Sequence, residues 1–115
     1  MMPLGEAGEE VAVKLLTAQG FRILQRNYIS PVGEIDIVAA RNHAVHFIEV
    51  KTRSNLAYGT PALAVTVAKQ DRLRRVATYY MAGHSYRGDA QFGVVEVVYN
   101  PYVKRYTAKL IPEAF

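Results

Sequence analysis

Two nearby stretches of the chain, residues 33–38 and residues 47–51, alternate between polar and apolar positions. Such alternation is typical of β-strands with one buried face, and the short connection between the stretches predicts a β-hairpin. Asn42-His43 is the best two-residue turn, because Asn tolerates the positive φ that such turns need. With this turn, the numbers of directly opposed residues sum to 85.

This register gives the hairpin one charged face and one apolar face. The charged face pairs Asp36 with Glu49 and Glu34 with Lys51, and the apolar face pairs Ile37 with Ile48 and Ile35 with Val50. A slip by one residue would bury the charges and expose the isoleucines, so the pattern itself specifies the register.

The charged face suggests a cation site. Two opposed carboxylates, with Cβ atoms about 4.5–5.5 Å apart, repel each other. A divalent cation between Asp36 and Glu49 would relieve that repulsion, since hard cations prefer carboxylate oxygen. Lys51 adds a positive charge that can hold a phosphate or a nucleophilic water. The alternative is that Glu34, Asp36, Glu49 and Lys51 form the solvated face of a half-exposed sheet.

The remaining elements complete an α/β pattern. We expect a helix over residues 4–20 ending at Gly20, a strand over 21–29, a helix from Thr60-Pro61 to about residue 82, and a final hairpin of residues 91–99 and 103–111 around Asn100-Pro101. A charged strand at the end of the chain suits the edge of a sheet. The order predicts one domain over residues 1–115, a mixed sheet with a helix on each face.

The first helix offers one acidic residue to the site. Its expected buried stripe is Leu4, Gly8, Val11 and Leu15. Glu9 lies at the flank of this stripe, whereas Glu10 points away and precedes Lys14 by four residues, as an ordinary surface pair does. Glu9 is therefore the acid that can reach the site. The alternative is an acid favoured by the positive end of the helix dipole.

The second helix and the loop before it offer further candidates. The expected stripe is Ala62, Val65, Leu73, Val76 and Tyr80, with Lys69 on the same line. Lys69 either extends its ammonium to the edge of the core or points toward the phosphate side of the site. Tyr58, in the loop, could stack on a base or pack at the foot of the loop. Arg22 and Arg26 on the first strand are expected to be solvated.

Composition narrows the function classes. The formal net charge is +4 with a pI near 9.5, which permits binding to polyanions. Cysteine is absent, which excludes thiol catalysis and zinc–thiolate sites and is compatible with the cytoplasm. No apolar run reaches the ~20 residues of a membrane span, so no membrane association is expected. The three histidines lack ligand spacing, which argues against a zinc site.

The residues of the charged face resemble a known nuclease signature. Asp36, followed thirteen positions later by Glu49-Val50-Lys51, resembles the PD-(D/E)XK motif of restriction-endonuclease-like proteins. The strings Gly33-Glu34-Ile35-Asp36 and Glu49-Val50-Lys51-Thr52-Arg53, with Gly8-Glu9 and Lys69, are similar to the YraN-like family of small bacterial proteins. That family in turn resembles archaeal Holliday junction resolvases, and the resemblance covers nearly the whole chain.

The resemblance implies a restriction-endonuclease-like fold and a metal-dependent nuclease acting on DNA or RNA. Asp36 and Glu49, with the Val50 carbonyl, would hold Mg²⁺ or Mn²⁺, which would activate water and stabilise charge on the phosphate. Lys51 would position the water or neutralise the transition state. The supporting residues would be Glu9 through the metal's water shell, Glu34 orienting Lys51, and Arg53, Tyr58, Lys69 and Arg72 contacting nucleic acid.

One departure from the family, one alternative function and one expected oligomeric state accompany this resemblance. Family members often carry Arg-Phe-Asp where this chain has Gln91-Phe92-Gly93, so that acid is missing or has moved to Asp89. The alternative function is a nucleic-acid-binding or assembly module that keeps the fold without cleaving. The resolvase resemblance also implies a homodimer, because cutting two symmetric strands requires two active sites.

Overall fold

The computed structural model describes residues 4–54, 66–84 and 88–112, which form two helices and five strands. The elements in chain order are α1 (Leu4–Ala18), β1 (Arg22–Ser30), β2 (Gly33–Arg41), β3 (Ala44–Ser54), α2 (Val67–Gly83), β4 (Asp89–Asn100) and β5 (Arg105–Pro112). In these residues, no helix is long and apolar enough to cross a membrane.

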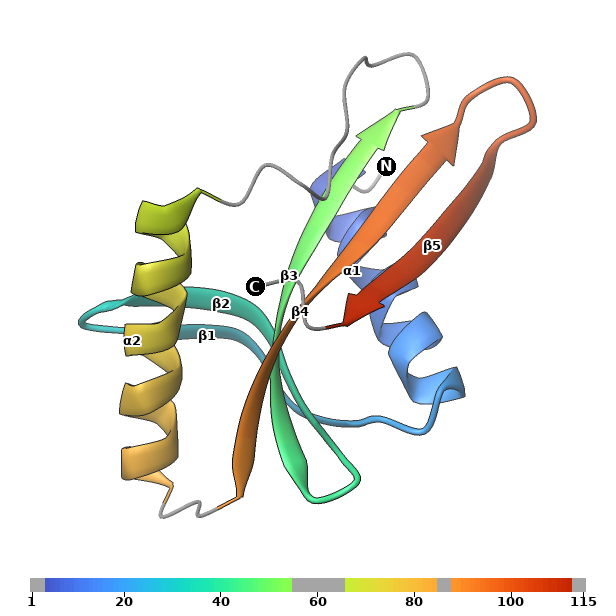
Figure 1. The fold of residues 1–115 in the computed structure, drawn as a ribbon. Coiled ribbons are helices and arrows are strands. Elements are labelled where there is room, and N and C mark those ends of the chain that lie inside the picture. The colour runs from blue at the N-terminus through green and yellow to red at the C-terminus, as the bar shows by residue number, and fades with distance from the viewer. Residues whose placement is uncertain (1–3, 55–65, 85–87, 113–115) are drawn as a thin grey trace.

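The strands form one sheet in the order β1-β2-β3-β4-β5. Neighbours are antiparallel except β3 and β4, which are parallel and are joined through the segment that contains α2. Helices α1 and α2 lie on opposite faces of the sheet (Figure 1). Each helix covers its own cluster of buried side chains, so the predicted mixed sheet with a helix on each face is confirmed.

The β2–β3 hairpin has the predicted turn and register at its closed end. Asn42 and His43 have φ values of 53° and 62°, as the two-residue turn requires. The paired residues run from Arg41 opposite Ala44 to Ile37 opposite Ile48, and every pair sums to 85. The alternation of side chains therefore specified this half of the hairpin correctly.

Beyond Ile37 and Ile48 the two strands separate, and the predicted pairing is wrong there. The ladder between β2 and β3 ends at this pair, so Asp36 is not paired with Glu49, Ile35 with Val50, or Glu34 with Lys51. Strand β2 instead bends away together with β1 and passes beside α2 (Figure 1). We call this opening between β2 and β3 the strand split.

Local backbone features explain the bend. Asn27 of β1 has a φ of 51°, and it lies between the residues that pair with Ile37 and Ile35. Ile35 then packs with the cluster under α2, whereas Ile37 packs with the cluster under α1. Gly33 has a φ of 143°, and a Cβ atom there would lie only 3.0 Å from Val76 of α2. Glycine thus lets β2 approach α2 closely.

Helix α1 is rotated relative to the predicted stripe. Its buried residues are Gly8, Ala12 and Leu16, while Leu4 is 40% exposed. A Cβ atom at Gly8 would overlap the side chain of Thr52, so glycine brings the helix backbone directly onto β3. This contact selects the face that the helix buries. The helix ends at Ala18, followed by Gly20 with a φ of 89°, which suits the predicted helix end.

Helix α2 begins later than predicted. Thr66 has an extended backbone and its hydroxyl accepts the N–H of Lys69, so it caps a helix that starts at Val67. Leu73, Val76 and Tyr80 are buried as predicted. The expected start at Thr60-Pro61, the expected stripe residues Ala62 and Val65, and Tyr58 lie outside the described residues.

The final hairpin is formed as predicted, with slightly different bounds. Asn100 pairs with Arg105, which leaves a four-residue turn over 101–104. Ala108 and Leu110 of β5 pack on the α1 side of the sheet, and Arg105, Thr107 and Lys109 are exposed. Strand β5 is thus the charged edge that the sequence indicates.

Candidate active site

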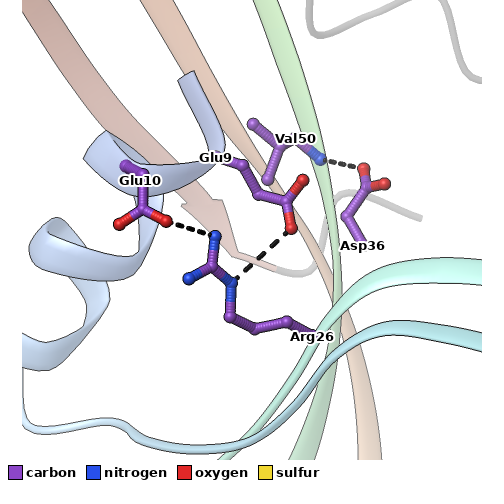
Figure 2. Close-up of polar contacts among 5 residues, drawn as sticks. All are labelled: Glu9, Glu10, Arg26, Asp36 and Val50. Carbon is purple, nitrogen blue, oxygen red and sulfur yellow. Dashed lines mark hydrogen bonds and ion pairs between the residues drawn. The ribbon is translucent and has the colours of Figure 1, made fainter. Parts of the chain in front are cut away.

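The strand split brings together the residues of the nuclease-like motif. Asp36 lies on β2 one residue beyond the end of the ladder, and its Oδ2 accepts the N–H of Val50 at 2.7 Å (Figure 2). This charge-assisted hydrogen bond replaces the backbone contact that the ladder would have made. The Val50 carbonyl faces the same gap, because a strand residue presents its N–H and C=O to one edge.

Two hollows open from the split, one toward each helix, and Asp36 lines both. The α1-side hollow has a volume of about 570 Å³ and is lined by Gly5, Glu6, Glu9, Asp36, Val50, Lys51 and Thr52. The α2-side hollow has a volume of about 200 Å³ and is lined by Gly33, Glu34, Asp36, Glu49, Lys69, Arg72 and Leu73. The Asp36 carboxylate therefore stands at the boundary between two different sets of charges.

The α2-side hollow holds the carboxylate pair. Glu49 is 8% exposed, and its carboxyl lies within hydrogen-bonding reach of Asp36. Burial raises the pKa of Glu49, and the negative charge of Asp36 raises it further. Lys69 Nζ lies 3.6 Å from Glu49 Oε2 and partly offsets this effect. Lys69 therefore points toward the carboxylate pair, and the phosphate-contacting role expected of it stays a prediction.

A pair of lysines completes this side of the split. The approach of the Lys69 ammonium lowers the pKa of Lys51, and burial lowers it further. The pKa of Lys69 is raised beside Lys51 and the carboxylate of Glu49. Lys69 thus lies beside Lys51 where the sequence predicted Glu34, because Glu34 pairs with Ile29 of β1.

On the α1 side, Glu9 is held by Arg26 of β1, a residue that the sequence did not place in the site. Arg26 Nε lies 3.7 Å from Glu9 Oε1, and Arg26 Nη2 donates to Glu10 Oε1 at 2.7 Å (Figure 2). The Glu9 side chain is 16% exposed, and its buried Oε1 accepts no hydrogen bond. Arg26 was expected to be solvated, and its contact depends on how α1 lies across β1, which spacing along the chain does not reveal.

The remaining candidates are Arg53, Arg72 and the two positions proposed for the missing acid. Arg53 Nη2 is 3.8 Å from Glu96 Oε1 on β4, and Arg72 lines the α2-side hollow. Of the two positions proposed for the missing acid, Gly93 pairs with Ile48, next to the Glu49–Val94 pair. Asp89 pairs with Ala44 at the other end of the parallel ladder. Gly93 is buried, and a side chain there would meet the Ile111 carbonyl and Leu110.

The described residues contain no group of three or more His, Cys, Asp or Glu side chains that could hold a metal ion. Glu9 is thus not grouped with both Asp36 and Glu49. Two adjoining carboxylates and a backbone carbonyl are nonetheless hard oxygen donors, and Mg²⁺ is usually bound by one or two carboxylates with water completing its shell. The chemistry of Asp36, Glu49 and Val50 fits such an ion.

Comparison with solved structures finds the same fold in an archaeal protein. The crystal structure of Hjc from Archaeoglobus fulgidus, a Holliday junction resolvase, matches with a TM-score of 0.51 at 23% identity. The match covers 90% of this chain and 72% of that one. The chain therefore has the restriction-endonuclease-like α/β fold, and this likeness concerns the fold alone.

Comparison with other sequences identifies bacterial relatives. A UPF0102 protein from Moorella thermoacetica is 49% identical over 94 residues, covering 81% of this chain and 78% of that protein. Another from Symbiobacterium thermophilum is 47% identical over 113 residues, covering 97% of this chain and 95% of that protein. The model of the uncharacterised protein family UPF0102 matches residues 8–97. The chain thus belongs to UPF0102, the YraN-like family.

Proposed function

We propose that this protein is a metal-dependent nuclease that hydrolyses phosphodiester bonds in DNA or RNA. The observation that carries the proposal is that the partly buried Asp36 and the buried Glu49 lie together, with Lys69 ion-paired to Glu49 and Lys51 beside them, at the edge of an open hollow. Two carboxylates this close repel each other and so oppose folding, which indicates that the pair is kept for a function.

The roles of the residues follow from their positions. Asp36, Glu49 and the Val50 carbonyl would hold Mg²⁺ or Mn²⁺, which supplies activation of water and neutralisation of phosphate charge when bound. Lys51 would position the attacking water or neutralise charge in the transition state. Lys69 would orient Lys51, the role first expected of Glu34. Glu9 would act from the α1-side hollow through water.

The fold supports branched DNA as one substrate to test. The Archaeoglobus fulgidus protein of the same fold is a Holliday junction resolvase. If this chain also cuts junctions, it must present two active sites, and hence form a symmetric dimer. Sedimentation that finds only monomer at micromolar concentration would favour a substrate that needs a single cut.

The test is a cleavage panel with matched variants. Pure protein is incubated with a four-way junction, duplex DNA, single-stranded DNA and single-stranded RNA, in Mg²⁺, Mn²⁺ or chelator. We expect metal-dependent products with the wild type and with Lys14→Ala on the outer face of α1, and none with Lys51→Ala. Binding without cleavage by the wild type across the panel would replace the nuclease with a nucleic-acid-binding module.

A further inference from the structure

The sheet face that carries Glu49 continues across β4 and β5 as an ordered set of rows. The register aligns residues of the three strands in rows that run outward from the split, namely Glu49 with Val94 and Ile111, Lys51 with Glu96 and Lys109, Arg53 with Val98 and Thr107, and finally Asn100 with Arg105. The ion pair between Arg53 and Glu96 places both side chains on this face. Ala108 and Leu110 pack on the opposite face, which leaves Arg105, Thr107 and Lys109 on the same face as Glu49.

This face is biased toward positive charge. It carries four cations, Lys51, Arg53, Arg105 and Lys109, and two acids, Glu49 and Glu96, so its net charge is 4 − 2 = +2. Arg105 and Lys109 are exposed, whereas Glu96 is ion-paired with Arg53. The α1-side hollow has the opposite balance of charge, because its lining includes three acids, Glu6, Glu9 and Asp36, and one cation, Lys51.

The rows also have a spacing that suits an extended polyanion. Alternate residues of a strand are about 6.8 Å apart, so the three steps from the Glu49 row to the Arg105 row span roughly 20 Å. A nucleic-acid strand advances about 3.4 Å per phosphate, so roughly six phosphates cover the same length. Charged side chains of either sign protect an edge strand from pairing with another chain. Protection of the edge therefore does not explain why the charges here are cations on the face that carries the carboxylate pair.

We propose that this face, which we call the β3–β5 track, binds the phosphate backbone of nucleic acid as it leaves the strand split. The proposal rests on the nuclease function and adds the path of its substrate. Lys51 and Arg53 lie at the inner end of the track, and Arg105 and Lys109 at its outer end. The outer pair contributes affinity without touching the bond that is cut.

The test removes the two outer cations of the track and compares the effect on binding with that of removing two cations elsewhere. The track variant is Arg105→Gln/Lys109→Gln, and the control is Lys14→Gln/Arg22→Gln, which removes two exposed cations from α1 and β1. Binding of fluorescein-labelled 20-nucleotide single-stranded and duplex DNA is followed by anisotropy in chelator between 50 and 200 mM salt. Circular dichroism melts verify that both variants are folded.

We expect the track variant to bind DNA about ten-fold more weakly than wild type at low salt. A plot of log K, where K is the association constant, against the logarithm of the salt concentration should be less steep by about 2, one for each lost phosphate contact. The control should bind within about two-fold of wild type. Equal losses in both variants would overturn the track, because net charge alone would then explain binding. The track would also be overturned if wild type bound neither the single-stranded nor the duplex DNA.

Cleavage kinetics separate failure of the track from failure of the nuclease. On a substrate that wild type cuts, the track variant should raise KM about ten-fold with kcat unchanged. Normal KM in the track variant, with cleavage retained, would reject the track and leave the nuclease standing. DNA binding that depends on Arg105 and Lys109, with no cleavage by wild type, would support the track and reject the nuclease.

Discussion

The two sides of the strand split use the same strands for different chemistry. On the α2 side, the buried Glu49 meets Asp36 and two lysines whose pKa values are shifted in opposite directions. On the α1 side, Glu9 meets an arginine that is shared with Glu10 and is itself partly exposed. Proximity to the motif thus does not define the site. From burial and the coupling between charges, we propose that the α2 side is the centre of the chemistry and the α1 side its support.

The largest contrast between the two sides should appear in turnover. Lys51→Ala removes the amine that lies beside Lys69 within the electrostatic influence of the two carboxylates, and loss of one such stabilising group typically lowers kcat by about 10²–10³-fold. DNA affinity should stay within a few-fold of wild type, because one of several phosphate contacts is lost. Single-turnover cleavage and anisotropy measure the two quantities. Retained cleavage would move the chemistry away from Lys51.

On the α1 side, the strongest structural effect should come from Gly8. Gly8→Ala places a methyl group against Thr52, and overpacking of this kind costs about 1–3 kcal/mol. Gly5→Ala on the same helix is the control, because a Cβ atom there has no neighbour within 4 Å, and it should stabilise by about 0.4–1 kcal/mol. Urea unfolding of both variants measures the difference. If Gly8→Ala is as stable as Gly5→Ala, the close packing of α1 on β3 is wrong.

In chelator, Glu49→Gln should stabilise the protein. Burial raises the pKa of Glu49, so its ionised form opposes folding, and this opposition grows as pH rises from the ordinary value of 4.5 through the raised folded pKa. The gain at neutral pH should be on the order of 1 kcal/mol, as at other sites that trade stability for function. Thermal melts from pH 4 to 8 test it. A gain that is equally large below pH 4.5 would contradict the electrostatic cause.

Asp36→Asn should behave differently from Glu49→Gln. Opposed charges alone predict that either neutral variant is more stable. The Asp36 carboxylate, however, also accepts the Val50 N–H at 2.7 Å, and its replacement weakens a charge-assisted bond that joins the separating strands. We therefore expect Asp36→Asn to gain less than Glu49→Gln in the same melts. A larger gain for Asp36→Asn would indicate that this hydrogen bond contributes little.

The smallest effect should come from Arg26. Its ion pairs with Glu9 and Glu10 involve side chains 37%, 16% and 44% exposed, so Arg26→Gln should cost at most about 1 kcal/mol. If Arg26 holds Glu9 toward the split, the variant should also slow cleavage several-fold, and Glu10→Gln should slow it less. A stability loss without any change in cleavage would restrict Arg26 to a structural role.

The sequence predicted the elements and the closed half of the hairpin because alternation and turn chemistry are local properties. It missed the strand split, since the bend depends on Asn27 in another strand and on Asp36 bonding to Val50. It likewise placed Glu34 opposite Lys51, where Lys69 from α2 lies instead. That contact forms only when the helix packs on the sheet, so no pattern along the chain could specify it.

The cation site itself provides the most direct test of the account. Crystals of the protein soaked in Mn²⁺ should show an anomalous peak about 2.0–2.2 Å from carboxylate oxygens of both Asp36 and Glu49. Lys69 should then have moved away from Glu49. A peak bound by Glu9 on the α1 side without Glu49, or no peak at either hollow at millimolar Mn²⁺, would contradict the assignment of the chemistry to the α2 side.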